Sequence, residues 1–110
     1  MENCIFCKIA NKEIPTRLLY EDENIIAFND LNPQAPVHIL VIPKKHFDSL
    51  NELEDNNIMS ALLNAVKKVT EKLSITDYRT VINTGKAVGQ EVFHLHLHVL
   101  AGRPFNWPPG

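Results

Sequence analysis

Three histidines at every second position are the feature of this chain that points most clearly to chemistry. Residues 94–98 read His-Leu-His-Leu-His. Side chains of a β-strand alternate between its two faces, so a strand here would put His94, His96 and His98 on one face and leucines on the other. Imidazole acts near neutral pH as a nucleophile, a general acid or base, or a metal ligand. The pattern therefore predicts a functional site on the histidine face.

Two kinds of site remain open for these histidines, a metal centre and covalent catalysis. In a straight strand His94 and His98 would lie ~13 Å apart, so a metal with bonds of ~2.1 Å could not bind both without strain. In covalent catalysis His96 attacks an electrophile such as phosphorus while a neighbour stabilises the developing charge. A phosphohistidine intermediate divides one difficult displacement into two easier ones.

The segment before the histidines favours an anion site. Residues 83–90 read Asn-Thr-Gly-Lys-Ala-Val-Gly-Gln. Glycines let backbone N–H groups approach phosphate oxygens, and Asn83 and Gln90 add neutral donors. The segment lacks the Gly-Lys-Ser/Thr ending of a P-loop. His38, at the start of an expected strand, could supply a fourth imidazole.

Two cysteines near the N-terminus form a separate motif. Cys4 and Cys7 have the Cys-x-x-Cys spacing of a zinc site or a redox pair. Redox use is the weaker interpretation, because the motif does not follow a strand of a βαβ unit. Two thiolates supply half of a tetrahedral zinc site, so the other ligands would come from His46, His38 or the histidine strand. Two buried reduced thiols are the alternative.

Composition limits the class of protein. With 110 residues, 45% hydrophobic and 22% charged, the chain fits one globular domain over residues 1–110. A net charge of −2 predicts no general attraction to nucleic acid. The sequence contains neither an apolar run of ~20 residues nor a signal-peptide pattern, so we expect a cytoplasmic protein without membrane contact.

The periodicity predicts one α+β domain, an antiparallel sheet with helices on one face. Asp55 is the expected N-cap of a long helix that ends near Lys72. Its expected apolar stripe is Ile58, Leu62, Val66, Val69 and Leu73. A short helix is expected over residues 5–10. The expected strands are residues 18–20, 25–28, 37–42, 81–82 and the histidine segment. Residues 103–110 form a proline-rich tail without periodicity.

The chain as a whole resembles the histidine triad (HIT) superfamily. Residues 94–100, His-Leu-His-Leu-His-Val-Leu, match the motif His-φ-His-φ-His-φ-φ, where φ is apolar. The resemblance extends along nearly the whole chain and is closest to the Hint branch, the histidine triad nucleotide-binding proteins. The other matching segments are residues 14–15, 20–22, 27–31, 33–38, 41–46, 83, 89–90 and 107–110.

The resemblance implies a fold and an activity. The implied fold is HIT-like, a five-stranded antiparallel sheet with one long and one short helix. The implied assembly is a homodimer with a continuous ten-stranded sheet. Hint proteins bind purine nucleotides and hydrolyse nucleoside phosphoramidates, such as AMP joined to an amine. They do so through a nucleotidyl-histidine intermediate and need no metal for catalysis. Two alternatives are a HIT hydrolase of dinucleoside polyphosphates and a non-enzymatic nucleotide-binding protein.

The resemblance also implies roles for individual residues. His96 would be the nucleophile, His98 would contact the phosphate, and His38 would lie beside them. Glu91, where eukaryotic Hint proteins carry serine, would attract a cationic leaving amine or act as an acid. Hydrolysis rather than transfer is implied by His98, since the transferase branch carries glutamine there. The implied nucleotide-binding residues are Asp30, Leu31, Asn83, Gly89, Gln90, Glu91, His96 and His98. The implied ligands of a structural zinc ion are Cys4, Cys7, His46 and His94.

Overall fold

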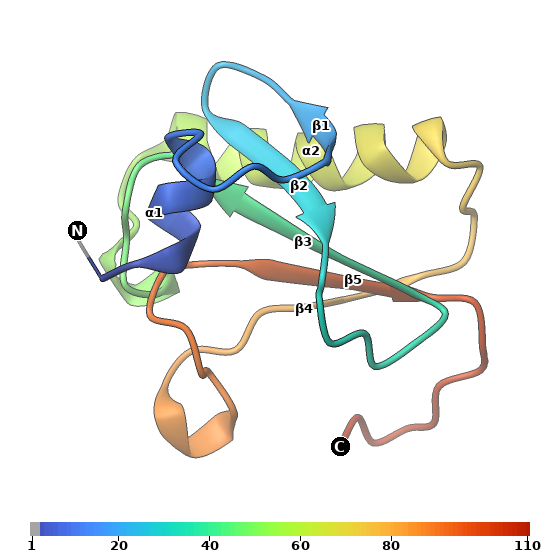
Figure 1. Ribbon diagram of the computed structural model, residues 1–110. Helices are drawn as coiled ribbons and strands as arrows, with labels where there is room; N and C mark the ends of the chain where they lie inside the picture. Colours follow the sequence, from blue (N-terminus) through green and yellow to red (C-terminus); the bar gives the residue numbers. More distant parts are fainter. Residues whose placement is uncertain (1–2) are drawn as a thin grey trace.

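The computed structural model describes residues 3–110, which form a five-stranded antiparallel sheet with two α-helices (Figure 1). The strand order is β1-β2-β3-β5-β4, and every neighbouring pair is antiparallel. This confirms the fold class expected from the sequence. The strands are β1 (Leu18–Glu21), β2 (Ile25–Asn29), β3 (Val37–Pro43), β4 (Arg79–Val81) and β5 (Leu97–Ala101).

The two helices cover opposite faces of the sheet, so the expectation of helices on one face is wrong. α1 (Ile5–Ala10) packs against Ile26, Leu40 and Ile42. α2 (Asn56–Lys72) packs on the other face, against residues such as Ala27 and Val41. Nearly every side chain of β2 and β3 is buried, because these central strands are apolar on both faces. A strand that is apolar on both faces needs a cover on each.

The long helix follows its sequence signals closely. The Asp55 side chain accepts hydrogen bonds from the N–H groups of Asn57 and Ile58 and caps the first turn. The expected stripe is buried except at Leu73, which is 41% exposed because it is the C-cap residue and lies beyond the last helical turn. The helix ends at Lys72, as predicted.

The histidine segment is only partly a strand. The ladder of β5 begins at Leu97, so His94 and His96 both precede it, and His94 lies in a bend. β3 ends at Pro43, whose ring nitrogen has no proton to donate to a ladder. The N–H of Leu95 donates instead to the Phe47 carbonyl, at 2.7 Å. The predicted alternation nevertheless holds, because the residues between the histidines are buried on the α2 side.

The C-terminal tail follows β5 without forming a helix or a strand, but it packs against the sheet edge. The Phe105 ring lies 4.2 Å from the Arg103 guanidinium carbon and 5.3 Å from that of Arg79. Arg79 also donates to the Asn106 carbonyl at 3.2 Å. None of the helices formed by residues 3–110 is long and apolar enough to cross a lipid bilayer.

Candidate active site

A cavity of about 590 Å³ lies on the α1 side of the sheet, between β5 and the loops that follow β2 and β4. It contains most of the residues expected from the sequence to act in catalysis or nucleotide binding. Those that line it are Asp30, Leu31, His38, Asn83, Gly89, Glu91, His96 and His98. A larger cavity, of about 680 Å³ beside Arg79 and Phe105, holds none of them, so volume alone does not locate the site.

The register of β3 and β5 brings His38 and His98 together. His38 is paired with Leu100 and His98 with Leu40, so the two histidines are diagonal neighbours on one face. His38 Nε2 lies 2.8 Å from His98 Nδ1. The sequence placed both residues in the site but gave no sign of this direct bond.

The hydrogen bonds fix where the protons of these two rings lie. The N–H of Gln34 donates to His38 Nδ1 at 3.0 Å, so the proton of neutral His38 is on Nε2. This Nε2–H donates to His98 Nδ1, which leaves the proton of His98 on its own Nε2. Burial lowers the pKa of His38, and it lowers the pKa of His98 to about 4. His98 is therefore neutral at pH 7 and keeps one N–H to donate to a ligand.

His96 has the opposite arrangement. Its Nδ1–H donates to the His94 carbonyl at 2.7 Å, so its Nε2 carries a lone pair. The ring is 7% exposed, lines the cavity and packs edge-on against Phe6, with ring centroids 5.2 Å apart. An imidazole that is held in one orientation by its Nδ1–H bond, with Nε2 left for a ligand, is suited to nucleophilic attack.

Asp30 and Leu31 lie where β2 leaves the sheet. Asp30 Oδ1 accepts from the N–H of Asn32, and its Oδ2 lies 3.4 Å from His38 Nε2. Leu31 is 96% exposed at the rim of the cavity. The polar atoms of Asp30, His38 and His98 lie within 4.8 Å of one another. A metal could not bind there while Gln34 donates to His38, because His38 would have no lone pair left.

One wall of the cavity was missed by sequence reasoning. The apolar residues Ile5, Phe6 and Ile9 of α1 line it beside His96. Their spacing on a short helix indicates a buried face, but only the tertiary structure shows that this face borders the site.

The glycine loop, defined here as residues 83–90, lies across the cavity from α1. Asn83 and Gly89 line the cavity, and Gly89 has a φ of 109°, which favours glycine. Gln90 differs from the sequence expectation, since it is 2% exposed and does not line the cavity. Its side chain therefore lies in the protein interior.

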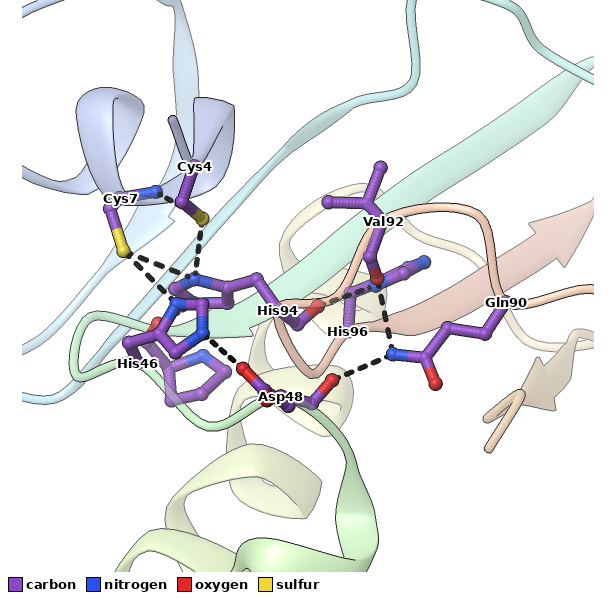
Figure 2. Close-up of polar contacts among 9 residues, drawn as sticks. Cys4, Cys7, His46, Asp48, Gln90, Val92, His94 and His96 are labelled. Atoms are coloured by element: carbon purple, nitrogen blue, oxygen red, sulfur yellow. Dashed lines mark hydrogen bonds and ion pairs between the residues drawn. The ribbon is translucent and has the colours of Figure 1, made fainter. Parts of the chain in front are cut away.

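A second group of polar side chains, the metal cluster, consists of Cys4, Cys7, His46 and His94 (Figure 2). His94 Nδ1 lies 3.3 Å from Cys4 Sγ and 3.4 Å from Cys7 Sγ, and His46 Nδ1 lies 3.3 Å from Cys7 Sγ. Ligands of a tetrahedral zinc ion are ~3.6 Å apart, given bonds of ~2.1–2.3 Å. Two thiols and two imidazoles at this spacing are compatible with zinc.

Each histidine of the metal cluster is oriented by a hydrogen bond at its Nε2, the ring nitrogen that faces away from the thiols. His46 Nε2 donates to Asp48 Oδ1 at 2.6 Å, and His94 Nε2 donates to the Pro43 carbonyl at 2.7 Å. Each ring therefore turns its Nδ1 toward the thiols, as metal-binding histidines do. Burial lowers the pKa of His94 to about 4, which keeps it neutral at pH 7. Asp48 was not expected from the sequence, although its place two residues after His46 is a usable signal.

Comparison with known proteins gives the family of the chain. The HIT domain family matches residues 11–105. A HIT-like protein of Synechocystis is 54% identical over 99% of this chain and 98% of its own length. A 14 kDa zinc-binding protein of Zea mays is 48% identical over 96% of this chain and 87% of its own length.

Solved structures give the same result. A HIT family hydrolase from Legionella pneumophila superposes with a TM-score of 0.92 and 46% identity, covering 98% of this chain and all of that one. A histidine triad nucleotide-binding protein from Candida albicans gives a TM-score of 0.85 and 34% identity, covering 98% of this chain and 85% of that one. The chain therefore belongs to the HIT domain family.

Proposed function

We propose that this protein is a hydrolase of purine nucleoside phosphoramidates that releases the nucleoside monophosphate through a nucleotidyl-His96 intermediate. The observation that carries the proposal is that two imidazoles with opposite hydrogen-bonding roles line one cavity. His96 offers a lone pair on Nε2, and His98 offers a proton on Nε2. The similarity to a HIT family hydrolase supports the reaction type, and the resemblance to the Hint branch supplies the nucleoside.

The nucleotide is proposed to bind with its phosphate beside the histidines and its ribose toward the loop after β2. Asp30 accepts hydrogen bonds from the ribose hydroxyls, and the exposed Leu31 packs against the nucleoside. Asn83, Gly89 and Glu91 line the cavity beside the phosphate and the leaving group. The Gly89 N–H already donates to the Lys86 carbonyl, so Asn83 and the N–H of Glu91 are the donors offered to the phosphate. Donors that are in place before the substrate arrives stabilise the charged transition state at little cost of reorganisation.

In the first step His96 Nε2 forms a bond to phosphorus, the P–N bond to the amine breaks, and the leaving nitrogen takes up a proton delivered from solvent, because an amine leaves poorly unless it is protonated. The ring becomes positively charged, and the His94 carbonyl, which accepts its Nδ1–H, stabilises that charge. His98 Nε2–H donates to a phosphate oxygen as the charge there redistributes. In the second step water attacks phosphorus, the bond to His96 breaks with its electron pair returning to Nε2, the proton of the water passes to solvent, and the monophosphate leaves.

The substrate class is tested by comparing two adenosine compounds. We expect kcat/KM for AMP joined to an amine to exceed that for a diadenosine polyphosphate by at least about 100-fold, or ~2.7 kcal/mol. A chromatographic assay of AMP release measures both. A preference for the diadenosine compound would contradict the proposal and favour a polyphosphate hydrolase. AMP binding without turnover of either compound would favour a non-enzymatic nucleotide-binding protein.

Glu91 is proposed to act on the leaving amine, because it is exposed at the edge of the cavity and forms no ion pair within residues 3–110. We expect Glu91→Gln to lower kcat/KM about tenfold for AMP joined to a lysine amide, which carries a further charge. AMP joined to tryptamine should be affected less. Glu54→Gln makes the same change of charge at an exposed position outside the cavity and should alter neither rate. Equal losses on both substrates would exclude this role.

Three further properties belong to the same proposal. The metal cluster binds a structural zinc ion, which catalysis does not require. The protein acts in the cytoplasm. It acts as a homodimer, which agrees with the position of β4 at the sheet edge and with the exposed apolar side chains of Met59 and Leu63 on α2.

A further inference from the structure

Gln90 has an unusual environment for a residue beside a binding site. It is 2% exposed, and every hydrogen-bonding atom of its amide has a partner. Its Oε1 accepts from the N–H of Gly85 at 2.9 Å. Its Nε2 donates to the Asp48 carbonyl at 2.7 Å and to the Val92 carbonyl at 3.1 Å. Both donors of the amide are used, and its oxygen already has a donor. Because the side chain is also buried, it does not present a free group to a ligand in the cavity.

These bonds hold the glycine loop from within. The N–H of Gln90 also donates to the Gly85 carbonyl at 3.1 Å, so Gly85 and Gln90 are bonded in both directions and close the loop. The turn Lys86–Val88 lies inside this closure. The two chain neighbours of Gln90 both line the cavity; they are Gly89 and Glu91. The position of Gln90 therefore sets the position of both neighbours.

The loop is also tied to the metal cluster through Asp48. The Asp48 carboxylate accepts from His46, while its backbone carbonyl accepts from Gln90 (Figure 2). Asp48 thus contacts His46 of the metal cluster and also Gln90, which holds the glycine loop. His46 and Gln90 come from separate parts of the sequence, and within this network Asp48 bonds to both of them.

We propose that Gln90 is a positioning residue that fixes the glycine loop to the segment carrying His46 and does not contact the nucleotide. This rests on the proposed function only in treating the cavity as a nucleotide site. The consequence is that a well-ordered metal cluster also keeps the glycine loop ordered where it lines the cavity. A fixed His46 holds Asp48, Asp48 holds Gln90, and Gln90 holds the backbone of Gly85 and of its own neighbours.

The test compares two variants by amide hydrogen exchange of the ligand-free protein and by AMP affinity. Gln90→Met keeps the size of the side chain and removes all three side-chain bonds. We expect protection of the Gly85 N–H to fall at least about tenfold, because its acceptor is lost, and AMP affinity to fall with it. Thr70→Val removes a buried hydrogen bond within α2, far from the loop, and should change neither quantity.

Gln90→Glu tests the acceptor and the donor roles of the Gln90 amide separately. It keeps an acceptor for Gly85 but loses the donor to Asp48 while the new carboxyl group is ionised. Burial raises the pKa of such a carboxyl, and once protonated it can donate to Asp48 again. In protein kept saturated with zinc, we therefore expect AMP affinity and Gly85 protection, each relative to the wild type at the same pH, to recover together as the pH is lowered, which loss of packing alone would not produce. This variant also decides the matter if Gln90→Met does not fold.

The metal gives a further readout. Chelation of the metal from the wild-type protein should lower Gly85 protection, and chelation from Gln90→Met should lower it no further. The proposal is overturned if AMP affinity falls in either variant while Gly85 protection in the ligand-free protein is unchanged, because that result indicates direct contact. It is also overturned if chelation acts equally on both proteins. Neither exchange nor AMP binding requires phosphoramidase activity, so the two proposals can fail separately.

Discussion

Replacement of His96 by glycine should lower kcat/KM for an adenosine phosphoramidate by about four orders of magnitude, or ~5.5 kcal/mol of transition-state stabilisation. The variant loses the only atom that forms the covalent intermediate, the Nε2 whose lone pair is left free by the Nδ1–H bond to the His94 carbonyl. The measurement is AMP release, together with intact-mass analysis of samples quenched in denaturant and kept at alkaline pH. Wild-type protein should carry an acid-labile AMP adduct, and His96→Gly should carry none.

Two controls separate loss of the nucleophile from loss of structure. Added imidazole can enter the space that His96→Gly creates, attack phosphorus in place of the side chain and restore part of the turnover without labelling the protein. His98→Gln keeps the nucleophile and removes the imidazole donor, so it should lose about 100-fold and still form the adduct. Equal turnover of wild type and His96→Gly, or an adduct on that variant, would show that His96 is not the nucleophile.

The alternation of residues 94–98 was sufficient to predict which side chains face the site, because a period of two survives even where the ladder is interrupted. The sequence could not show that the ladder begins only at Leu97. That boundary depends on Pro43 in the neighbouring strand. A local sequence pattern does not show which distant segments pair with one another, so it could not predict this boundary. Leu73 was misplaced for a related reason, since a helical stripe does not show where the last turn ends.

The polar network of the site was the least predictable part. The bond between His38 and His98 arises from the diagonal register of β3 and β5, and the orientation of Gln90 arises from the backbone of Asp48. Both depend on the positions of main-chain atoms that come together only in the folded state. The types of residue in the site could be predicted from the sequence. Which atoms donate and which accept could be seen only in the folded structure.

Removal of the metal should lower Tm by roughly 15 °C. Zinc present at about 1,000 times its dissociation constant stabilises a folded protein by ~4 kcal/mol, and each kcal/mol shifts the Tm of a domain of this size by about 4 °C. α1 has six residues, too few to be stable alone, and the cluster joins it to His46 and His94. The measurement is Tm before and after chelation, with metal content determined on protein purified without added zinc.

Substitutions on α1 give a matched comparison for the metal. Cys7→Ser removes one ligand and should reproduce most of the effect of chelation, and chelation of this variant should then change little. Lys8→Ala alters the next residue of the same helix without touching the cluster and should shift the free energy of unfolding by less than about 1 kcal/mol. Absence of zinc from gently purified protein, or a Tm unaffected by chelation, would exclude a structural zinc ion.

The affinity for zinc should also depend on pH in a defined direction. Zinc binds thiolates, and burial of Cys7, reinforced by the adjacent Cys4, raises the pKa of its thiol to about 11 in the metal-free protein. Binding at pH 7 therefore releases protons, and the affinity weakens as the pH is lowered. The stabilisation lost on chelation should shrink in the same direction.

Removal of the metal should also affect substrate binding, because α1 supplies Ile5, Phe6 and Ile9 to the cavity wall. If α1 is less firmly held, we expect KM for the nucleotide substrate to rise more than kcat falls.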